Sequence, residues 1–351
     1  MYTQQKEADM QYTKLGKSGL IVSKLACGTM TFGQGTLVAD WKTNIDQKAA
    51  NEIVNTALDA GINFFDTADM YTNGQSEIML GKALKNKRTS TIIATKCGFR
   101  SGEAITDTGL SYRYILQSVQ TSLQRLNTDY IDLFLLHIPD PFTRLEESAK
   151  ALEAVIQKGW VRYVGFCNYP SWKAQKLMGI QEKSGFSKCI TSQMYYSLLG
   201  RDIEHDVVPF LQESNLGLMV WSPLASGFLA GKYTRENPIP KDSRRAKFDF
   251  PPVDVEKGYE VVDLLNKIAE KHRATIPQIA ISWLLAKPYV STVLIGASKI
   301  DQLQDNLGAA NIILDDNDIE NLDKLTEIAP LYPAWMQPMG WDQKVREALG
   351  K

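Results

Sequence analysis

Four side chains able to hold or transfer a proton stand at the ends of apolar runs in this sequence. Asp66 closes one such run and Tyr71 follows it closely, whereas Lys96 and His137 close the next two runs. A phenol, whose reference pKa is about 10, exchanges protons poorly at neutral pH unless its anion is stabilised. A nearby lysine ammonium would stabilise that anion, a carboxylate would keep the lysine charged, and a neutral imidazole could donate a hydrogen bond to a substrate oxygen. These residue types suggest a proton-delivery site, provided that the fold brings them together.

Each of the four residues also has an ordinary structural interpretation. Asp66 could cap a helix or form half of an ion pair, and Tyr71 could be an aromatic residue at the rim. Lys96 could be a solvated strand end, and His137, one of three histidines, could be held by backbone hydrogen bonds. Charged residues that close apolar runs on successive strands are harder to explain in this way, because a buried charge needs a partner.

Short apolar runs alternate with amphipathic helices from Leu25 onward, a pattern typical of repeated βα units. The strands are expected at residues 25–28, 62–66, 91–96, 131–137, 162–167, 190–195, 217–221 and 293–295. Eight such units predict a closed (β/α)8 TIM barrel. In such a barrel the C-terminal ends of all eight strands face the same side, and the side chains that carry out chemistry lie there. An open doubly wound sheet is the alternative, but no G-x-G-x-x-G follows the first strand.

Segments outside the repeat complete the expected architecture. Turn chemistry predicts an N-terminal β-hairpin from Tyr12 to Val22, outside the main sheet. A loop should follow the first strand, with a helix from about Asp46, and Ser171 should cap the helix after the fifth strand. An extra C-terminal helix is expected at residues 318–328, followed by an aromatic tail at residues 332–338. No domain boundary is visible, so residues 10–351 are expected to form a single barrel domain.

The composition is that of an ordinary globular chain, with 351 residues, 44% hydrophobic and 23% charged, and a formal net charge of -1. This balance, without a run of basic and aromatic residues, argues against nucleic acid as a partner. The four cysteines are isolated from one another, so a C-x-x-C pair, a zinc pattern and a bound metal are not expected. The start of the chain is polar and no apolar run reaches membrane-spanning length. We therefore expect a cytoplasmic protein that is not inserted in a membrane.

The sequence resembles the aldo-keto reductase superfamily over roughly residues 12–311. The matching elements are Asp66-Thr67-Ala68-x-x-Tyr71 with Gly74 and Ser76-Glu77, Lys96, Leu136-His137, Lys158-Gly159-x-Val161-Arg162-Tyr163-x-Gly165 and Trp221-Ser222-Pro223-Leu224. Several motifs in this order on these strands make the resemblance specific. It implies that Tyr71 is a general acid tuned by Lys96 and Asp66. It also implies that His137 orients the carbonyl group of the substrate.

The resemblance further implies a nicotinamide cofactor and assigns residues to it. Asn168 and Gln193 would hold the carboxamide, and Trp221 would stack on the nicotinamide ring. The segment that starts at Gly296 runs from a strand end into a helix start, where backbone amides favour phosphate, and it would bind the adenosine end. The full implied set is Gly28, Thr29, Met30, Asp66, Asn168, Gln193, Trp221, Ser222, Pro223, Leu224, Gly227, Lys232, Arg244, Gly296, Ser298, Gln302 and Asn306. The ordinary alternatives are polar strand ends, a core tryptophan and a helix capped by Ser298.

Within the superfamily the sequence is most similar to the microbial branch and to potassium-channel β subunits. In that group the long seventh loop, residues 227–252 here, folds over the cofactor. Arg244 with Ser298 and Gln302 would then clamp a 2′-phosphate, which favours NADPH or NADP over NADH, unless Arg244 is a solvated loop charge. Two residues depart from the family pattern. Cys167 replaces the common serine before Asn168, and Thr72 replaces the usual glycine after the tyrosine.

The leading hypothesis is an NADPH-dependent oxidoreductase that reduces a small-molecule aldehyde or ketone to an alcohol by reversible hydride transfer. The alternative is a β-subunit-like regulatory module that binds NADP and a partner and turns over slowly. A metal-dependent barrel hydrolase or isomerase is a weaker alternative, because His137 is the only histidine at a predicted strand end. The substrate, the preferred direction, the oligomeric state and the role of the aromatic tail stay open.

Overall fold

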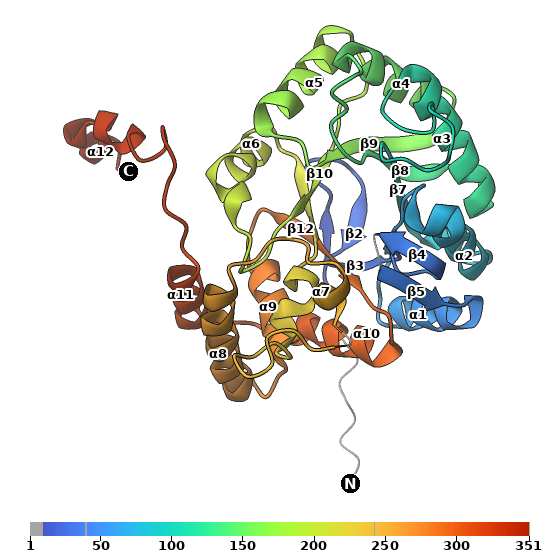
Figure 1. The fold of residues 1–351 in the computed structure, drawn as a ribbon. Helices are drawn as coiled ribbons and strands as arrows, with labels where there is room; N and C mark the ends of the chain where they lie inside the picture. The colour runs from blue at the N-terminus through green and yellow to red at the C-terminus, as the bar shows by residue number, and fades with distance from the viewer. Residues whose placement is uncertain (1–9, 39–40, 242, 351) are drawn as a thin grey trace.

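A computed structural model describes residues 10–38, 41–241 and 243–350, and its centre is a closed barrel of parallel strands (Figure 1). The strands around the barrel are β3 (Leu25–Gly28), β6 (Phe64–Asp66), β7 (Ile92–Cys97), β8 (Ile131–Leu136), β9 (Val161–Cys167), β10 (Thr191–Tyr195), β11 (Gly217–Trp221) and β12 (Val290–Gly296). Their spatial order follows the sequence, and β12 closes the barrel against β3. The predicted (β/α)8 TIM barrel is confirmed.

The strand register aligns the ends that carry the polar residues. Gly28 pairs with both Asp66 and Gly296, so the ends of β12, β3 and β6 lie level. On the other side of β7, Cys97 pairs with Leu136, the residue before His137. The parallel register therefore brings Asp66, Lys96 and His137 to one rim of the barrel.

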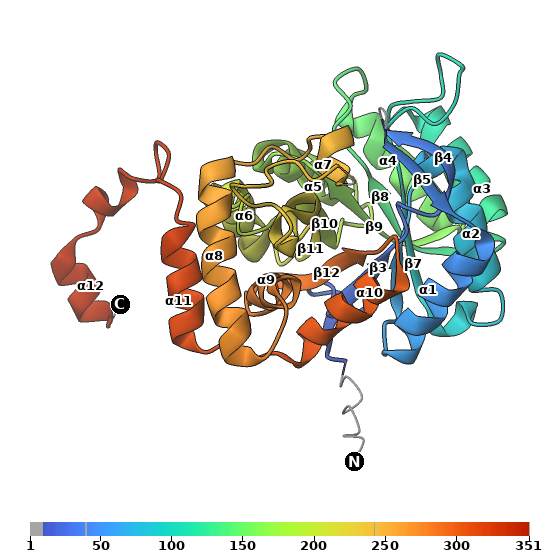
Figure 2. The same ribbon diagram turned by 60° about the horizontal axis from the view of Figure 1, so that its bottom comes forward.

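Helices surround the barrel in both views (Figures 1 and 2). They are α1 (Gln47–Asp59), α2 (Gln75–Ala83), α3 (Tyr112–Leu126), α4 (Leu145–Gln157), α5 (Ser171–Lys183), α6 (Val207–Glu213), α8 (Val255–His272), α9 (Ile276–Leu285), α10 (Ile300–Leu307) and α11 (Asp316–Leu325). The short helix α7 (Arg244–Lys247) lies in the long connection between β11 and α8. Helix α3 illustrates how local residues set the ends of a helix. Ser111 caps its start by accepting a hydrogen bond from the Tyr114 backbone amide, and Asn127 ends it in a left-handed conformation. Its apolar stripe, which includes Ile115 and Val119, is buried against the barrel.

The core has two layers. Inside the barrel, side chains from most of its strands meet, including Phe64, Leu133, Leu135 and Met219. A larger layer lies between the strands and the helices. Full burial of side chains of this size stabilises a fold by about 1.5–3 kcal/mol each, so the barrel rim can carry polar groups that cost stability.

The N-terminal hairpin closes the barrel at the end opposite Asp66 and Lys96. It consists of β1 (Tyr12–Lys14) and β2 (Ile21–Ser23), and it forms its own small sheet as predicted. Leu15 in its turn is fully buried in the barrel interior cluster. The Lys17 backbone amide donates to the Asn215 carbonyl at 3.1 Å, which ties the turn to the base of β11.

This contact predicts that substitutions at two glycines of the same turn differ strongly in their effect on the stability of the protein. A side chain on Gly16, which has φ +61°, would place its Cβ 2.7 Å from the Ile190 carbonyl oxygen and 2.8 Å from the Gly217 nitrogen. These are backbone atoms that cannot move aside, so Gly16→Ala should lower the free energy of unfolding by about 2–4 kcal/mol. Gly19→Ala is the matched control, because its Cβ would meet nothing within 4 Å. Urea unfolding of both variants measures the difference, and equal midpoints would show that the hairpin does not seal the barrel.

Several local predictions need correction. The segment after β3, expected as a loop, forms a second hairpin from β4 (Gly33–Val38) and β5 (Trp41–Ile45). The prediction that Ser171 caps α5 is wrong, because Pro170 occupies that position and Ser171 is the first helical residue. Similarly, α10 is preceded by Lys299 and not capped by Ser298. The eighth strand is also longer than its short apolar run indicated.

The C-terminal tail is not simply extended. Beyond α11 it contains a 3-10 turn, Gln337–Gly340, and the short helix α12 (Gln343–Leu349). Both views show α12 standing away from the barrel (Figures 1 and 2), and Trp335 and Trp341 are exposed. No helix in the described parts of the chain is long and apolar enough to cross a membrane.

Candidate active site

An ion pair lies at the centre of the rim. Lys96 Nζ is 2.6 Å from Asp66 Oδ1 and also donates to the Thr67 carbonyl oxygen at 2.7 Å. The Lys96 side chain is fully buried and that of Asp66 is 3% exposed. Burial alone would lower the pKa of Lys96, but the Asp66 carboxylate and the Tyr71 phenol raise it above its usual range. Lys96 is therefore a permanent buried cation at neutral pH.

Tyr71 lies next to this cation. Its hydroxyl is 3.3 Å from Lys96 Nζ, and the lysine ammonium also lies 4.9 Å from the centroid of its ring. Burial raises the pKa of Tyr71, while Lys96 acts to lower it. The phenol therefore holds its proton at neutral pH, and the lysine stands where it would stabilise the anion left by proton transfer.

His137 completes the group. Its ring centroid is 5.9 Å from that of Tyr71 and 4.7 Å from that of Phe99, both in edge-to-face geometry. Burial, together with the charge of Lys96, lowers the pKa of His137 well below its usual value. The imidazole is thus neutral, and its buried Nδ1 has no hydrogen-bond partner among the described residues. The structure brings Asp66, Tyr71, Lys96 and His137 together at one site.

The two side chains that the family resemblance assigns to the nicotinamide carboxamide form hydrogen bonds within the protein. Gln193 Nε2 donates to Asp66 Oδ2 at 2.8 Å, so it holds the second carboxylate oxygen in place. Asn168, which has φ +59°, donates to the His137 carbonyl oxygen at 3.0 Å and accepts from Trp221 Nε1 at 3.1 Å. Both amides therefore help to orient the residues around them.

Aromatic rings surround Trp221. The Tyr195 ring is tilted against it at 5.2 Å, and Phe250 from the long seventh loop stacks on it at 5.9 Å with an interplanar angle of 16°. A hollow of about 310 Å³ opens beside Asn168, with Tyr195 in its wall. The rim on this side is consequently aromatic and partly open.

The residues at the C-terminal end of β3 differ from one another in burial and in their contacts. Thr29 is fully buried and its hydroxyl bonds to the Asp66 carbonyl oxygen at 3.0 Å and to Ser76 Oγ at 2.9 Å. Met30 packs beside Tyr71 together with Trp41. A Cβ on Gly28 would meet only the backbone of β12 within 4 Å, at 3.8 Å or more. This strand end therefore supports Asp66 and leaves open backbone next to Gly296.

The last strand runs into α10. A Cβ on Gly296 would meet only the Gly28 carbonyl oxygen, at 3.7 Å, so the backbone there can be approached closely. The Ser298 amide donates to Gln302 Oε1 at 3.2 Å, and Asn306 is buried one turn further along α10. The segment therefore offers backbone and amide groups in an open cradle.

Arg244 of the seventh loop has no acidic partner among the described residues, although two other arginines of this loop do. Arg235 and Arg245 both form ion pairs. Arg244 instead stacks on the Trp41 ring, with Cζ 4.0 Å from the centroid, and its buried Nε has no partner in the described chain. Burial lowers the pKa of Arg244 to about 10, and it stays charged at neutral pH. A buried cation left without an anion among the described residues fits a phosphate-bearing ligand.

The remaining residues assigned to the cofactor shape the start of that loop. Ser222 has φ +54° and its hydroxyl accepts from the Ser226 amide at 3.0 Å, while Gly227 has φ +84°. A Cβ on Gly227 would lie 3.8 Å from Lys232 Nζ, which places this exposed amine over the turn. Pro223 and Leu224 connect β11 to the 3-10 segment Ala225–Ala230. These positive-φ residues turn the chain sharply over the rim.

The two departures from the family pattern have structural explanations. Cys167 belongs to the apolar cluster inside the barrel, and burial keeps its thiol neutral by raising its pKa. Thr72 has φ +46° and packs against Gly33, where a Cβ would lie 2.6 Å from Thr72 Cγ2. Thr72 thus links the Tyr71 turn to the β4–β5 hairpin.

Sequence reasoning missed the aromatic residues Trp41, Phe99 and Phe250. Each lies on a connection between barrel elements and not at the end of a barrel strand, although Trp41 begins β5, so no periodic pattern marks it. The only signal is a large aromatic residue in a segment otherwise rich in glycine or proline. Their contacts with Arg244, His137 and Trp221 depend on the closed fold.

Comparison with known proteins agrees with this geometry. Residues 24–327 match the model of the Aldo/keto reductase family. The chain belongs to this family. Its relatives include a protein from Arabidopsis thaliana described as a probable voltage-gated potassium channel subunit beta, 36% identical over 87% of this chain and 92% of the relative. A protein of Schizosaccharomyces pombe, described as a putative voltage-gated potassium channel subunit beta, is 35% identical over 92% of this chain and 94% of the relative.

Aldo/keto reductases generally reduce carbonyl groups with NADPH, and membership implies oxidoreductase chemistry. The open cradle at Gly296 and the unpaired Arg244 are compatible with such a cofactor. Within the described ranges no cluster of three or more His, Cys, Asp or Glu side chains could hold a metal ion.

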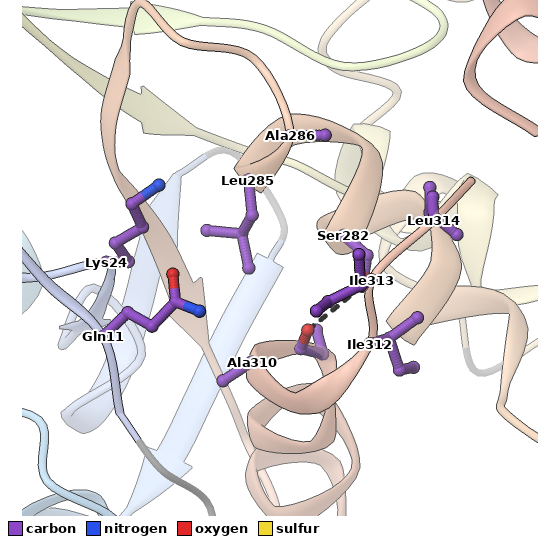
Figure 3. Close-up of a pocket in the computed structure, with 10 residues that line it drawn as sticks. Gln11, Lys24, Ser282, Leu285, Ala286, Ala310, Ile312, Ile313 and Leu314 are labelled. Atoms are coloured by element: carbon purple, nitrogen blue, oxygen red, sulfur yellow. Dashed lines mark hydrogen bonds between the residues drawn. The ribbon is translucent and has the colours of Figure 1, made fainter. Parts of the chain in front are cut away.

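A separate pocket lies at the opposite end of this aldo/keto reductase barrel (Figure 3). Its volume is about 170 Å³, and apolar side chains such as Leu285 and Ile312 line it beside Lys24 and Gln11. Lys24 immediately precedes β3, so the pocket faces the N-terminal ends of the strands. It contains none of the candidate site residues.

Proposed function

We propose that the protein is an NADPH-dependent reductase of aldehydes or ketones in which Tyr71 is the general acid. The observation that carries this proposal is the continuous chain of contacts from Asp66 through Lys96 to the Tyr71 hydroxyl, with neutral His137 beside it. Each member is in the charge state that the reaction requires. The four buried, unpaired cysteines suit a reducing compartment, and we propose the cytoplasm.

The chain's own residues would deliver the proton. His137 donates a hydrogen bond to the carbonyl oxygen and orients it. The Tyr71 O–H bond then breaks, its proton passes to that oxygen, and Lys96 stabilises the resulting phenolate. Asp66, held by Gln193, keeps Lys96 charged and in place. Water later restores the proton to Tyr71.

The dinucleotide would be held by the backbone near Gly28 and Gly296 and by the loop that carries Arg244. When bound, NADPH supplies the hydride that is added to the carbonyl carbon. Asn168 and Gln193 would have to share or exchange their present hydrogen bonds to reach the carboxamide. Phe250 stacks on Trp221, so the seventh loop would have to move at this point to admit the nicotinamide ring.

Arg244→Gln should separate the two dinucleotides. Removing the guanidinium should weaken NADPH binding by about ten- to a hundredfold, because a charge-assisted contact with phosphate contributes about 1.5–3 kcal/mol. NADH lacks that phosphate and should bind with nearly unchanged affinity. Titration of protein fluorescence with each dinucleotide measures both constants. Arg245→Gln is the control, since Arg245 is already paired with Asp249; equal losses for NADPH and NADH in Arg244→Gln would contradict the assignment.

The function itself is tested by oxidation of NADPH and NADH by the pure protein against a panel of aldehydes, ketones and sugars. Turnover of at least one carbonyl class with NADPH supports the proposal. Dinucleotide binding without turnover of any carbonyl would reject it.

A second candidate is a regulatory module similar to a channel β subunit, because the relatives reported above carry that description. The presence of all four chemical groups favours an active reductase. Negligible turnover combined with stable co-purification of a membrane partner would favour the regulatory module instead.

A further inference from the structure

Asp69 lies on the four-residue segment between Asp66 and Tyr71, and it is buried at 2% exposure. Its carboxylate does not enter the proposed reaction. Oδ2 accepts hydrogen bonds from Tyr114 Oη at 3.1 Å and Ser118 Oγ at 3.0 Å, both on α3. Oδ1 is buried and has no partner in the described chain. The proton-delivery segment is thus fastened to a helix outside the barrel.

The backbone of Asp69 makes two further attachments. Its amide donates to the Lys96 carbonyl oxygen at 3.1 Å, and its carbonyl accepts from Arg125 Nη1 at 2.9 Å. Arg125 also pairs with Glu77 at 3.1 Å, and Glu77 accepts from Thr95 Oγ1 at 2.7 Å. Asp69 is therefore the point where the Tyr71 segment meets α2, α3 and β7.

We propose that Asp69 is a positioning residue for Tyr71, whose anchored carboxylate holds the phenol at the distance from Lys96 that proton delivery needs. This inference rests on the proposed function. It does not require Asp69 to touch substrate or cofactor. The Tyr71 hydroxyl is 3.3 Å from Lys96 Nζ, a long contact that a small shift of the segment would break.

A carboxylate is an expensive choice for a purely structural anchor here. Asparagine has the same shape and would accept the same two hydrogen bonds without a buried charge. The groups that face Asp69 are Glu77 from α2, Tyr114 and Arg125 from α3 and Cys97 from β7. Arg125 bonds to Glu77 and to the Asp69 carbonyl oxygen, and among the described residues no cation bonds to the Asp69 carboxylate itself.

Burial and the neighbouring Glu77 raise the pKa of Asp69 from 3.8 to about 7, against the hydrogen bonds from Ser118 and Tyr114. Because this folded-state pKa is raised, the unfolded chain ionises first, and the wild type loses stability as the pH rises from about 3.8 to about 7. Above that range a charged Asp69 makes stronger, charge-assisted bonds to Tyr114 and Ser118. As the pH rises, the free energy of unfolding should therefore fall while the positioning of Tyr71 improves.

The experiment compares Asp69→Asn with the wild type at pH values well below and well above about 7. At low pH the two proteins should have similar kcat, because the wild-type side chain is then neutral as well. At high pH Asp69→Asn should lose kcat by about ten- to a hundredfold with unchanged KM and unchanged NADPH affinity, because a small misplacement of a catalytic group slows the reaction by this order. Its melting temperature should at the same time exceed that of the wild type.

Tyr114→Phe is the second variant, and it avoids any change on the Tyr71 segment. Loss of one donor to the carboxylate should lower kcat and move the pH dependence of kcat upward, since that hydrogen bond lowers the Asp69 pKa. Wild-type kcat for Asp69→Asn at all pH values, or a wild-type pH profile for Tyr114→Phe, would overturn the inference. A wild-type protein inactive towards every carbonyl would instead overturn the proposed function, so the two failures are distinguishable.

Discussion

Tyr71→Phe should lower kcat for carbonyl reduction by about 10²–10⁴-fold, the usual contribution of a positioned general acid. The variant removes one hydroxyl group whose only described partner is Lys96 Nζ. The ring would keep its packing with Ala68 and Met30, so the fold should persist. NADPH affinity, measured by fluorescence titration, should remain close to that of the wild type, which separates the loss of chemistry from a loss of binding.

Tyr195→Phe is the matched control for this experiment. Tyr195 stands on the same rim and contacts Trp221, but its hydroxyl bonds to Ser197 and not to Lys96. Its kcat should change only a few-fold. If Tyr71→Phe reduces an aldehyde at the wild-type rate, or if both variants lose activity equally, Tyr71 is not the general acid.

The pH dependence of the wild type gives a related check on the same residue. Burial raises the pKa of Tyr71, and the protonated form is the one that donates. Once Asp69 is ionised, at pH values above about 7, the reduction rate should therefore be maintained and should fall only at alkaline pH, where Tyr71 loses its proton.

The barrel was predictable because parallel strands buried on both faces leave continuous apolar runs, as Leu133 to Leu136 does. The same reasoning marked Asp66, Lys96 and His137, since a polar residue that closes such a run must lie at the rim. Resemblance to the family added the roles, which strand ends alone do not supply.

What could not be predicted depends on contacts between distant parts of the chain. The Gln193–Asp66 hydrogen bond joins residues 127 positions apart, and nothing in either segment indicates it. The β4–β5 hairpin was missed because Gly33 and Gly35, at φ +121° and +132°, interrupt the alternation that marks a strand. The anchor at Asp69 was also missed, because its partners are ordinary polar residues on the buried side of α3.

Lys96→Met should have the largest effect on both stability and activity. It would leave the Asp66 carboxylate buried with only Gln193 as a side-chain partner, and breaking a buried pair in this way destabilises a protein by about 3–5 kcal/mol. The Tyr71 pKa should rise further, because the cation that lowers it is gone, and reduction should be lost. Urea unfolding and the carbonyl assay measure the two effects.

The pH dependence and a double variant identify the cause of that instability. Burial already raises the Asp66 pKa against the opposing charge of Lys96, and without Lys96 that pKa should rise further. Protonation of Asp66 should therefore restore part of the stability of Lys96→Met as the pH falls. Asp66→Asn combined with Lys96→Met removes both charges and should regain much of the lost unfolding free energy at neutral pH, since neither member is left as a buried ion. Activity should stay absent in the double variant, because Tyr71 still lacks the ammonium that stabilises its anion. If the changes in unfolding free energy of the two single variants simply add in the double variant, the Asp66–Lys96 pair is not coupled. If the double variant regains turnover, Lys96 is not needed for proton delivery.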